Sequence, residues 1–355
     1  MQAVASGRDR RRAGRRDAAG GVDVTGLQII HGDALALPLS DAVVDLIVTS
    51  PPYFGLRSYT DAGEHYDGQI GDEGTPAEFV DALIAATAEM VRVLKPEGSI
   101  WVNLGDKYVA DNRGSGRDSK RGDAKHAPRG DGGFVGRETA RQKSLIGVPW
   151  RYAIRCIDEL GLILRAEVIW SKPNGLPESV TDRVRRSHET WFHFTLQPRY
   201  FSGVDEIREA HVTVAPGTPS TGGRGYEPHM TGFMNGVAHP LGKLPGSVWT
   251  IPTQPLIVPA ELGVDHFAAF PMEWPRRIIR GWSPEGGTVL DPFGGTGTTA
   301  LVASVLGRHG ISVDMSADYC RLAGWRTSDP GERARAAEMP KPKPVIVPDG
   351  QEVLW

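Results

Sequence analysis

The sequence feature that most constrains the fold is a pair of prolines, Pro51 and Pro52, at the end of the apolar segment 43–49. Neither proline has an N–H to donate and both fix φ, so a β-strand over this segment must end there. The strand end leaves a hydroxyl at Ser50, a carbonyl at Pro51 and an aromatic ring at Tyr53. Open α/β sheets bind their ligands at the carboxyl ends of strands. This group suits a flat ring that carries an amino group, because Ser50 and Pro51 can accept its N–H bonds and Tyr53 can stack on it.

The composition is that of an ordinary globular protein. The chain has 355 residues, of which 40% are hydrophobic and 23% charged, and it can bury one large α/β core or two modest ones. Two cysteines rule out a disulfide scaffold and a Cys-rich zinc site, so a reducing cytoplasm is the default location. No apolar run approaches the roughly 18–20 residues of a membrane span. The histidines of 203–248 lack metal-ligand spacing, and no metal is expected.

Strand and helix signals alternate along much of the chain. Strands are expected at 27–30, 41–49, 99–104, 288–290 and 309–314, with an adjacent strand pair at 162–170 and 190–196. Helices are expected from the capping box at Thr75–Glu78, at 150–160 and at 298–306. This alternation indicates a mainly parallel sheet.

Other segments carry little periodicity. Residues 1–22 are expected to be a disordered basic tail, 106–143 a flexible basic loop, and 203–248 an irregular insert. The chain past Trp325 is charged and Pro-rich, and is expected to be loose. The expected division is one catalytic domain over 23–330 and a tail over 331–355.

A second chemical motif lies far from the first. The glycine turn at 294–297 opens a helix directly after a strand, where a ligand can approach backbone N–H groups. Residues 295–300 fit the loose dinucleotide fingerprint, and Asp314 follows about 20 residues later, where an acidic residue usually binds ribose hydroxyls. The turn therefore predicts a nucleoside-cofactor site, but alone it does not separate NAD from S-adenosylmethionine.

Together, the two motifs resemble the amino-methylating DNA methyltransferases, the N4-cytosine/N6-adenine family. Residues 49–53 look like the catalytic motif of that family, and residues 291–299 look like its cofactor loop. Further similar blocks lie at 169–174, 183–189, 246–252, 267–287 and 307–323. The order, with the catalytic motif first, a recognition insert next and the cofactor loop last, is that of the beta class. The chain departs from the family at Leu196-Gln197-Pro198, where relatives often carry Lys, and the loop at 106–143 matches no motif.

The resemblance implies a Rossmann-like, S-adenosylmethionine-dependent α/β fold. Its sheet would be seven-stranded and mainly parallel, with helices on both faces and the insert at 203–248 as the target-recognition region. The implied substrate is double-stranded DNA, and a cognate restriction endonuclease is a further suggested partner. The protein would be a cytoplasmic enzyme of a bacterium or phage and a monomer or homodimer. The implied catalytic residues are Ser50, Pro51, Pro52 and Tyr53. The implied cofactor residues are Asp33, Phe267, Asp291, Pro292, Phe293, Gly294, Gly295, Thr296, Gly297, Thr298, Thr299 and Asp314. The arginines expected to contact DNA are Arg113, Arg117, Arg183, Arg185 and Arg186.

The implied mechanism is direct methylation of an exocyclic amino nitrogen. Such a nitrogen is a poor nucleophile because its lone pair is delocalised into the ring, and accepting its N–H bonds localises that lone pair. The base must leave the duplex to reach such a pocket. The Ser at position 50 favours cytosine N4, with adenine N6 as the alternative. An NAD-dependent oxidoreductase, a non-catalytic DNA-binding relative, and an enzyme acting on RNA or protein are the rival interpretations.

A few residues outside these motifs also have an expected role. Cys156 and Cys320 are expected in the core, which disfavours methylation at a ring carbon, and Trp170 and Trp249 are expected to pack. Asp106 is expected to cap an element or line the pocket. The pair 188–189 is expected to orient the central strands or to contact DNA, and the sequence does not choose.

Overall fold

The computed structural model describes residues 26–55, 60–61, 64–65, 68–109, 141, 143–175, 177–210, 239–264, 269–339, 345–346 and 352–353. The predicted basic tail, most of the loop at 106–143 and residues 211–238 of the insert lie outside this range, as do Arg113, Arg117 and Phe267. In the described part of the chain, no helix is both long and apolar enough to cross a membrane.

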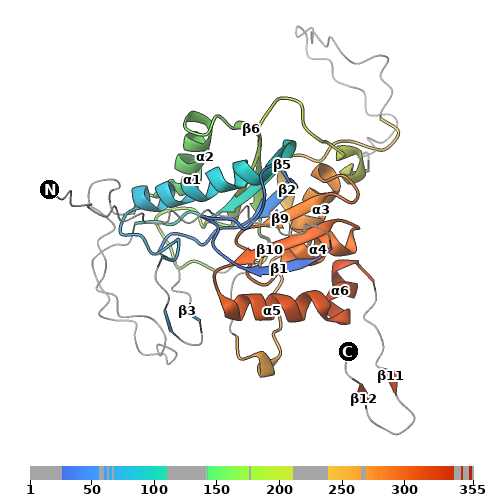
Figure 1. Ribbon diagram of the computed structural model, residues 1–355. Coiled ribbons are helices and arrows are strands. Elements are labelled where there is room, and N and C mark those ends of the chain that lie inside the picture. The colour runs from blue at the N-terminus through green and yellow to red at the C-terminus, as the bar shows by residue number, and fades with distance from the viewer. Residues whose placement is uncertain are drawn as a thin grey trace, which may run out of the picture.

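An eight-stranded sheet forms the centre of the molecule, in the order β1-β10-β9-β2-β5-β7-β6-β8 (Figure 1). The strands are β1 (Gln28–His31), β2 (Val44–Thr49), β5 (Leu94–Leu104), β6 (Ile163–Ser171), β7 (His188–Thr195), β8 (Val248–Thr250), β9 (Thr288–Asp291) and β10 (His309–Asp314). Strands β1, β10, β9, β2 and β5 run parallel, and β7 is antiparallel to both β5 and β6. The predicted parallel sheet and strand pair are confirmed. The sheet has one strand more than expected, because the three-residue β8 pairs with the edge of β6.

Helices cover both faces of the sheet. They are α1 (Pro76–Val93), α2 (Val148–Asp158), α3 (Glu273–Trp282), α4 (Thr298–Val305), α5 (Ala317–Ser328) and α6 (Pro330–Ala336). Short 3-10 turns are η1 (Val204–Ile207) and η2 (Ala260–Leu262), and two-residue strands pair as β3 (Thr60–Asp61) with β4 (Glu64–His65) and as β11 (Val345–Ile346) with β12 (Glu352–Val353).

The alternation of side chains along β2 explains the two layers. Ile47 is buried in the core that α1 and α2 cover, whereas Leu46 and Val48 are buried in the core that α3 and α4 cover. Successive side chains of a strand point to opposite faces, so one strand contributes to both cores. In Figure 1, α1 and α2 accordingly lie on one side of the sheet, and α5 and α6 lie on the other.

The start of α1 follows the predicted capping box. Thr75 Oγ1 accepts a hydrogen bond from the N–H of Glu78 at 3.2 Å, and Pro76 occupies the first turn, where its missing N–H costs nothing. The helix ends at Val93, and β5 begins at once. The strand expected at 99–104 therefore begins five residues earlier, at Leu94.

Residues 326–336 are not loose, contrary to expectation. Helix α5 continues to Ser328, and Asp329 then caps α6 by accepting the N–H of Glu332 at 2.8 Å. Arg326 and Glu332 are both buried and form an ion pair at 2.9 Å. The charged side chains Arg326 and Glu332 therefore form a buried ion pair instead of a solvated surface. The expected tail over 331–355 is wrong for residues 331–336, which belong to α6.

Candidate active site

The two distant motifs meet in one cavity. Strands β2 and β9 are neighbours, with Ile47 paired to Leu290, so their carboxyl ends lie side by side. A cavity of about 800 Å³ opens at this edge. The predicted residues that line it are Asp33, Ser50, Pro51, Pro52, Tyr53, Arg186, Pro292, Phe293, Gly294, Gly295, Thr296, Thr298 and Asp314.

Asp291 joins the two half-sites from below the cavity. Its Oδ1 accepts the hydroxyl of Thr49 at 2.6 Å and the N–H of Phe293 at 3.1 Å. Its Oδ2 accepts the hydroxyl of Thr299 at 2.9 Å. Burial raises the pKa of Asp291 to about 6, and these hydrogen bonds act against that rise. Among the described cofactor candidates, Asp291, Gly297 and Thr299 do not line the cavity, so the structure gives them a role in shaping it.

The glycine turn is shaped by hydrogen bonds within the protein. The N–H of Gly294 donates to Val313 O at 2.9 Å, that of Gly295 to Asp314 Oδ2 at 2.8 Å, and that of Gly297 to Gly294 O at 2.8 Å. A Cβ at Gly294 would lie 1.8 Å from Ser312 Oγ, so only glycine fits there. Because all three glycine N–H groups are in use, the glycines do not form a pyrophosphate cradle of the dinucleotide type. This arrangement favours a nucleoside without a pyrophosphate over NAD.

Two carboxylates at the ends of β1 and β10 face the same cavity. Asp314 accepts the N–H groups of Gly295 and of Ser316, the latter at 2.9 Å, and Asp33 accepts that of Leu35 at 2.8 Å. Carboxylate oxygens are acceptors for hydroxyl and amino donors. These groups fit the ribose and adenine of an adenosine cofactor.

The hydroxyl of Ser50 has a defined direction. It donates to Oδ1 of Asn103 at 3.3 Å, while Asn103 Nδ2 donates to Thr190 O at 3.3 Å and so fixes the amide. Since the hydrogen of Ser50 is engaged by Asn103, the lone pairs of Ser50 Oγ remain available to accept an N–H from a ligand. The Tyr53 hydroxyl lies 2.7 Å from Asn103 Oδ1 and 2.9 Å from Glu189 Oε2.

Asn103 was not identified as a functional residue from the sequence. It is 1% exposed and lies in the otherwise apolar buried stretch 100–104 of β5. A single amide in a buried strand needs hydrogen-bond partners, and its presence before a strand end could have marked it.

The described arginines expected to contact DNA differ in their surroundings. The Arg183 guanidinium lies 3.7 Å from the Tyr108 ring centroid and donates to Glu178 at 2.7 Å, so it holds its own loop in place. Arg186 lines the cavity and lies 3.6 Å from Asp106, whereas Arg185 is exposed. Asp106 both lines the cavity and caps α2, because it accepts the N–H of Gly147 at 3.0 Å.

Comparison with known proteins decides the family. The sequence profile of a DNA methylase family, the N6/N4 methylases, matches residues 44–324. The chain belongs to this family of DNA methylases. The methylase is 34% identical over 305 residues to the Type II methyltransferase M.Cfr9I of Citrobacter freundii, covering 85% of this chain and 88% of that protein. It is 36% identical over 303 residues to M.XycI of Xanthomonas campestris pv. cyanopsidis, covering 85% and 87%.

A solved structure shows the same fold. The methylase superposes on the PvuII DNA methyltransferase (cytosine-N4-specific) with a TM-score of 0.58 at 21% identity, covering 90% of this chain and 94% of that one. The predicted S-adenosylmethionine-dependent methyltransferase fold is confirmed, and S-adenosylmethionine is the cofactor of the methylase.

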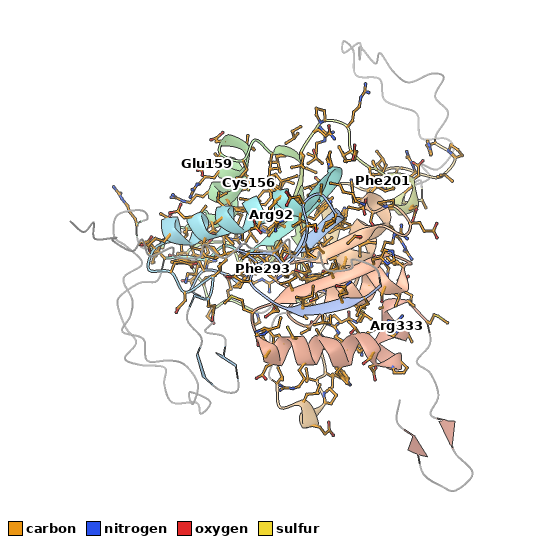
Figure 2. The ribbon with its side chains drawn as sticks, viewed as in Figure 1. Arg92, Cys156, Glu159, Phe201, Phe293 and Arg333 are labelled. Carbon is orange, nitrogen blue, oxygen red and sulfur yellow. The ribbon has the colours of Figure 1, made fainter. Side chains whose placement is uncertain are left out.

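Cysteine chemistry has no place in this cavity. Both cysteines of the methylase lie in the described part of the chain, and neither lines the cavity. Cys156 is fully buried on α2, where burial raises the pKa of its thiol to about 12, and Figure 2 labels it near Glu159, which directly follows the helix. Trp170 and Trp249 are each 4% exposed, which confirms that they pack. Among the described residues, no group of three or more His, Cys, Asp or Glu side chains could hold a metal ion.

Proposed function

We propose that the methylase transfers a methyl group to the exocyclic amino nitrogen of a base flipped out of duplex DNA, with N4 of cytosine as the target. The observation that carries this proposal is the direction of the Ser50 hydroxyl. Its hydrogen is engaged by Asn103 at 3.3 Å, so its oxygen can act as an acceptor toward an amino group in the cavity. Serine in this place favours cytosine in the family resemblance, and adenine N6 is the alternative.

Hydrogen-bond acceptors at Ser50 and Pro51 suit an amino group for a chemical reason. The lone pair of an aromatic amine is delocalised, and two accepted N–H bonds favour the pyramidal nitrogen on which that lone pair is localised. Preorganised acceptors in a partly enclosed site stabilise the charge that develops on such a nitrogen. Tyr53 lines the same cavity and provides a ring on which the base can stack.

The cofactor half of the cavity is assigned in the same way. When bound, S-adenosylmethionine supplies an electrophilic methyl group. We infer that Asp314 accepts hydrogen bonds from the ribose hydroxyls, that Asp33 accepts one from the adenine amino group, and that Phe293 contacts the adenine ring; all three line the cavity, which supports this assignment. The turn 294–297 gives the sugar close access to the backbone, because no Cβ is present at its glycines.

Duplex DNA would reach the cavity over the segment that carries Arg185 and Arg186. Arg185 is exposed and can neutralise a phosphate, whereas Arg186 lies in the cavity wall beside Asp106. The relatives named above are Type II methyltransferases. We therefore infer a role in a restriction-modification system.

Product analysis tests the proposal. Purified methylase is incubated with duplex DNA and methyl-labelled S-adenosylmethionine, and the DNA is digested to nucleosides for mass spectrometry. The expected product is N4-methylcytosine. Label found only in N6-methyladenine would overturn the choice of base, and no label in DNA would overturn the proposed reaction.

A variant pair tests the role of Ser50. Ser50→Ala is expected to lower the rate of methyl transfer far more than the affinity for S-adenosylmethionine, since the cofactor half of the cavity is unchanged. Ser202→Ala is the matched control, because Ser202 is exposed and lies after β7, at the end of the strands opposite the cavity. Methylation by Ser50→Ala at the wild-type rate would refute the assigned role.

A further inference from the structure

Glu189 is a carboxylate in the cavity wall that the proposed reaction does not use. Its side chain is 18% exposed, and it lies second in β7, opposite Trp170 of β6. Its Oε2 lies 2.9 Å from the Tyr53 hydroxyl, and its Oε1 accepts a hydrogen bond from Lys172 at 2.5 Å. The sequence left open whether this residue orients the central strands or contacts DNA, and these contacts point into the catalytic motif instead.

Lys172 is itself held in place. Its side chain is 18% exposed, and its Nζ lies 4.1 Å from the ring centroid of Trp170, which is buried. A partly desolvated cation is favourable both beside a carboxylate and over an indole face. The position of the Glu189 carboxylate is therefore fixed by a neighbouring strand, not by Tyr53 alone.

The Tyr53 hydroxyl lies between two acceptors. It has one hydrogen, and both Asn103 Oδ1 at 2.7 Å and Glu189 Oε2 at 2.9 Å lie within hydrogen-bond distance. On one side the ring packs on Gly105, where a Cβ would lie 2.5 Å from Tyr53 Cε2. Two polar contacts at the tip and one packing contact at the edge thus fix the plane of the ring.

We propose that Glu189 and Lys172 are positioning residues that act through the Tyr53 hydroxyl. They hold the Tyr53 ring in the plane on which the flipped base stacks. This inference rests on the proposed function, because it assumes that Tyr53 contacts the target base. The desolvation cost of a largely buried ion pair can exceed its Coulombic gain, so the pair is weak evidence for a role in stability alone. Its contact with Tyr53 indicates a role in positioning that residue.

A double-mutant cycle tests the proposal. Glu189→Gln keeps the shape of the side chain but removes the ion pair, and Tyr53→Phe keeps the ring but removes the hydroxyl. Single-turnover rates are measured with methyl-labelled S-adenosylmethionine and duplex DNA, and cofactor affinity is measured by calorimetry. Each single variant is expected to lower the rate roughly tenfold, the effect of one positioned hydrogen bond, with cofactor affinity changed less than about twofold.

The decisive result is the double variant. If Glu189 acts through the hydroxyl, Glu189→Gln has no further effect in the Tyr53→Phe background, so the double variant is as fast as Tyr53→Phe. Multiplied rate losses would overturn the proposal, because Glu189 would then act elsewhere. Loss of cofactor binding in Glu189→Gln would also overturn it, because the residue would then be needed for the fold of the site.

A control variant and the wild-type rate keep the outcome interpretable. Lys172→Met removes the same ion pair from the other side, and it is expected to match Glu189→Gln in rate and in its lack of effect in the Tyr53→Phe background. It replaces Glu189→Gln in the cycle if that variant does not fold. Failure of the proposed function would appear as no methyl transfer to DNA by the wild-type protein, whereas failure of this inference leaves the wild-type rate intact and makes the cycle additive.

Discussion

The buried carboxylate of Asp291 gives the sharpest prediction about stability. Burial raises the pKa of this group from its ordinary value of 3.8 to about 6. The folded protein therefore retains a proton on Asp291 between pH 4 and 6, where the unfolded chain has lost it. Stability contributed in this way is fully present below pH 4 and is lost as the pH rises through about 6. At about 1.4 kcal/mol per pKa unit, the loss is about 3 kcal/mol.

Asp291→Asn removes this titration while keeping the size of the side chain. The amide oxygen can still accept from the N–H of Phe293 and the hydroxyl of Thr49, which both bond Oδ1 in the wild type, and the hydroxyl of Thr299 can accept from the amide nitrogen. We expect the free energy of unfolding of the variant, relative to wild type, to rise by about 3 kcal/mol from pH 4 to pH 7 and to level off above that.

Urea unfolding followed by circular dichroism, at a series of pH values from 4 to 8, measures this difference. Asp158→Asn is the control, because Asp158 is exposed at the end of α2. Variant and wild-type curves that stay parallel across the whole range would refute the reasoning, since Asp291 would then titrate alike in the folded and unfolded states.

Three further predictions follow from other parts of the structure. His193 is buried against Trp101, and burial lowers the pKa of its imidazole to about 3 from 6.5, so it contributes stability above pH 6.5 that is lost on acidification. Between pH 6.5 and 3, the free energy of unfolding of His193→Phe is therefore expected to fall by roughly 5 kcal/mol less than that of the wild type. A pH profile identical to that of the wild type in the same urea assay would contradict this. Arg185→Ala should lower the slope of log affinity for duplex DNA against log salt concentration by about one. Arg199 is exposed at the opposite end of the sheet, so Arg199→Ala should leave this slope unchanged. Equal slopes for the two variants, measured by fluorescence anisotropy, would refute a contact between Arg185 and a DNA phosphate. Gly294→Ala should abolish cofactor binding measured by calorimetry, because the new Cβ would lie 1.8 Å from Ser312 Oγ. Combining it with Ser312→Gly should restore part of the binding. If the double variant does not bind the cofactor, the clash with Ser312 is not the cause of the loss.

The controls Ser202→Ala and Arg199→Ala come from the end of the sheet opposite the cavity. The N–H of Phe201 donates to Glu97 O at 2.9 Å, near the amino-terminal end of β5, so Arg199 and Ser202 lie at the other end of the strands from Ser50. Phe201 and Phe293 accordingly lie well apart in Figure 2. Variants on this edge change charge or hydroxyl content without touching the cavity.

Much of the site could be predicted because local rules set it. Two prolines end β2 at one place, a glycine turn begins α4 directly after β9, and the capping box starts α1 where the pattern indicates. The partners of these motifs could not be predicted, since they come from elements far away in the chain. The pattern can mark Asn103 as an amide in a buried strand and Glu189 as a polar residue at a strand start, but only the antiparallel pairing of β5 with β7 brings both to the Tyr53 hydroxyl.

The dependence on distant partners also explains why the role of Asp291 differs from the one expected. Asp291 follows a strand in the turn of a cofactor loop, as a ligand-binding residue would, yet its two oxygens are occupied by Thr49, Thr299 and the turn itself. Sequence position places a carboxylate at the edge of a sheet but does not decide whether it faces the ligand or the layer beneath. That choice depends on which hydroxyls the neighbouring strand and helix present.

The link between the half-sites explains why a costly buried carboxylate is present at all. The catalytic motif and the cofactor turn lie at opposite ends of the chain, and apolar packing alone would allow them to shift relative to each other. Asp291 binds Thr49 directly before Ser50 and Thr299 in the first turn of α4, so one side chain links the two motifs. In the proposed reaction, a misplacement of about 1 Å between reacting groups can cost a hundredfold in rate, which corresponds to about 3 kcal/mol of activation free energy. That is comparable to the stability that ionised Asp291 costs above pH 6, so under the proposed function the lost stability is offset by a fixed separation between the Ser50 motif and the cofactor turn.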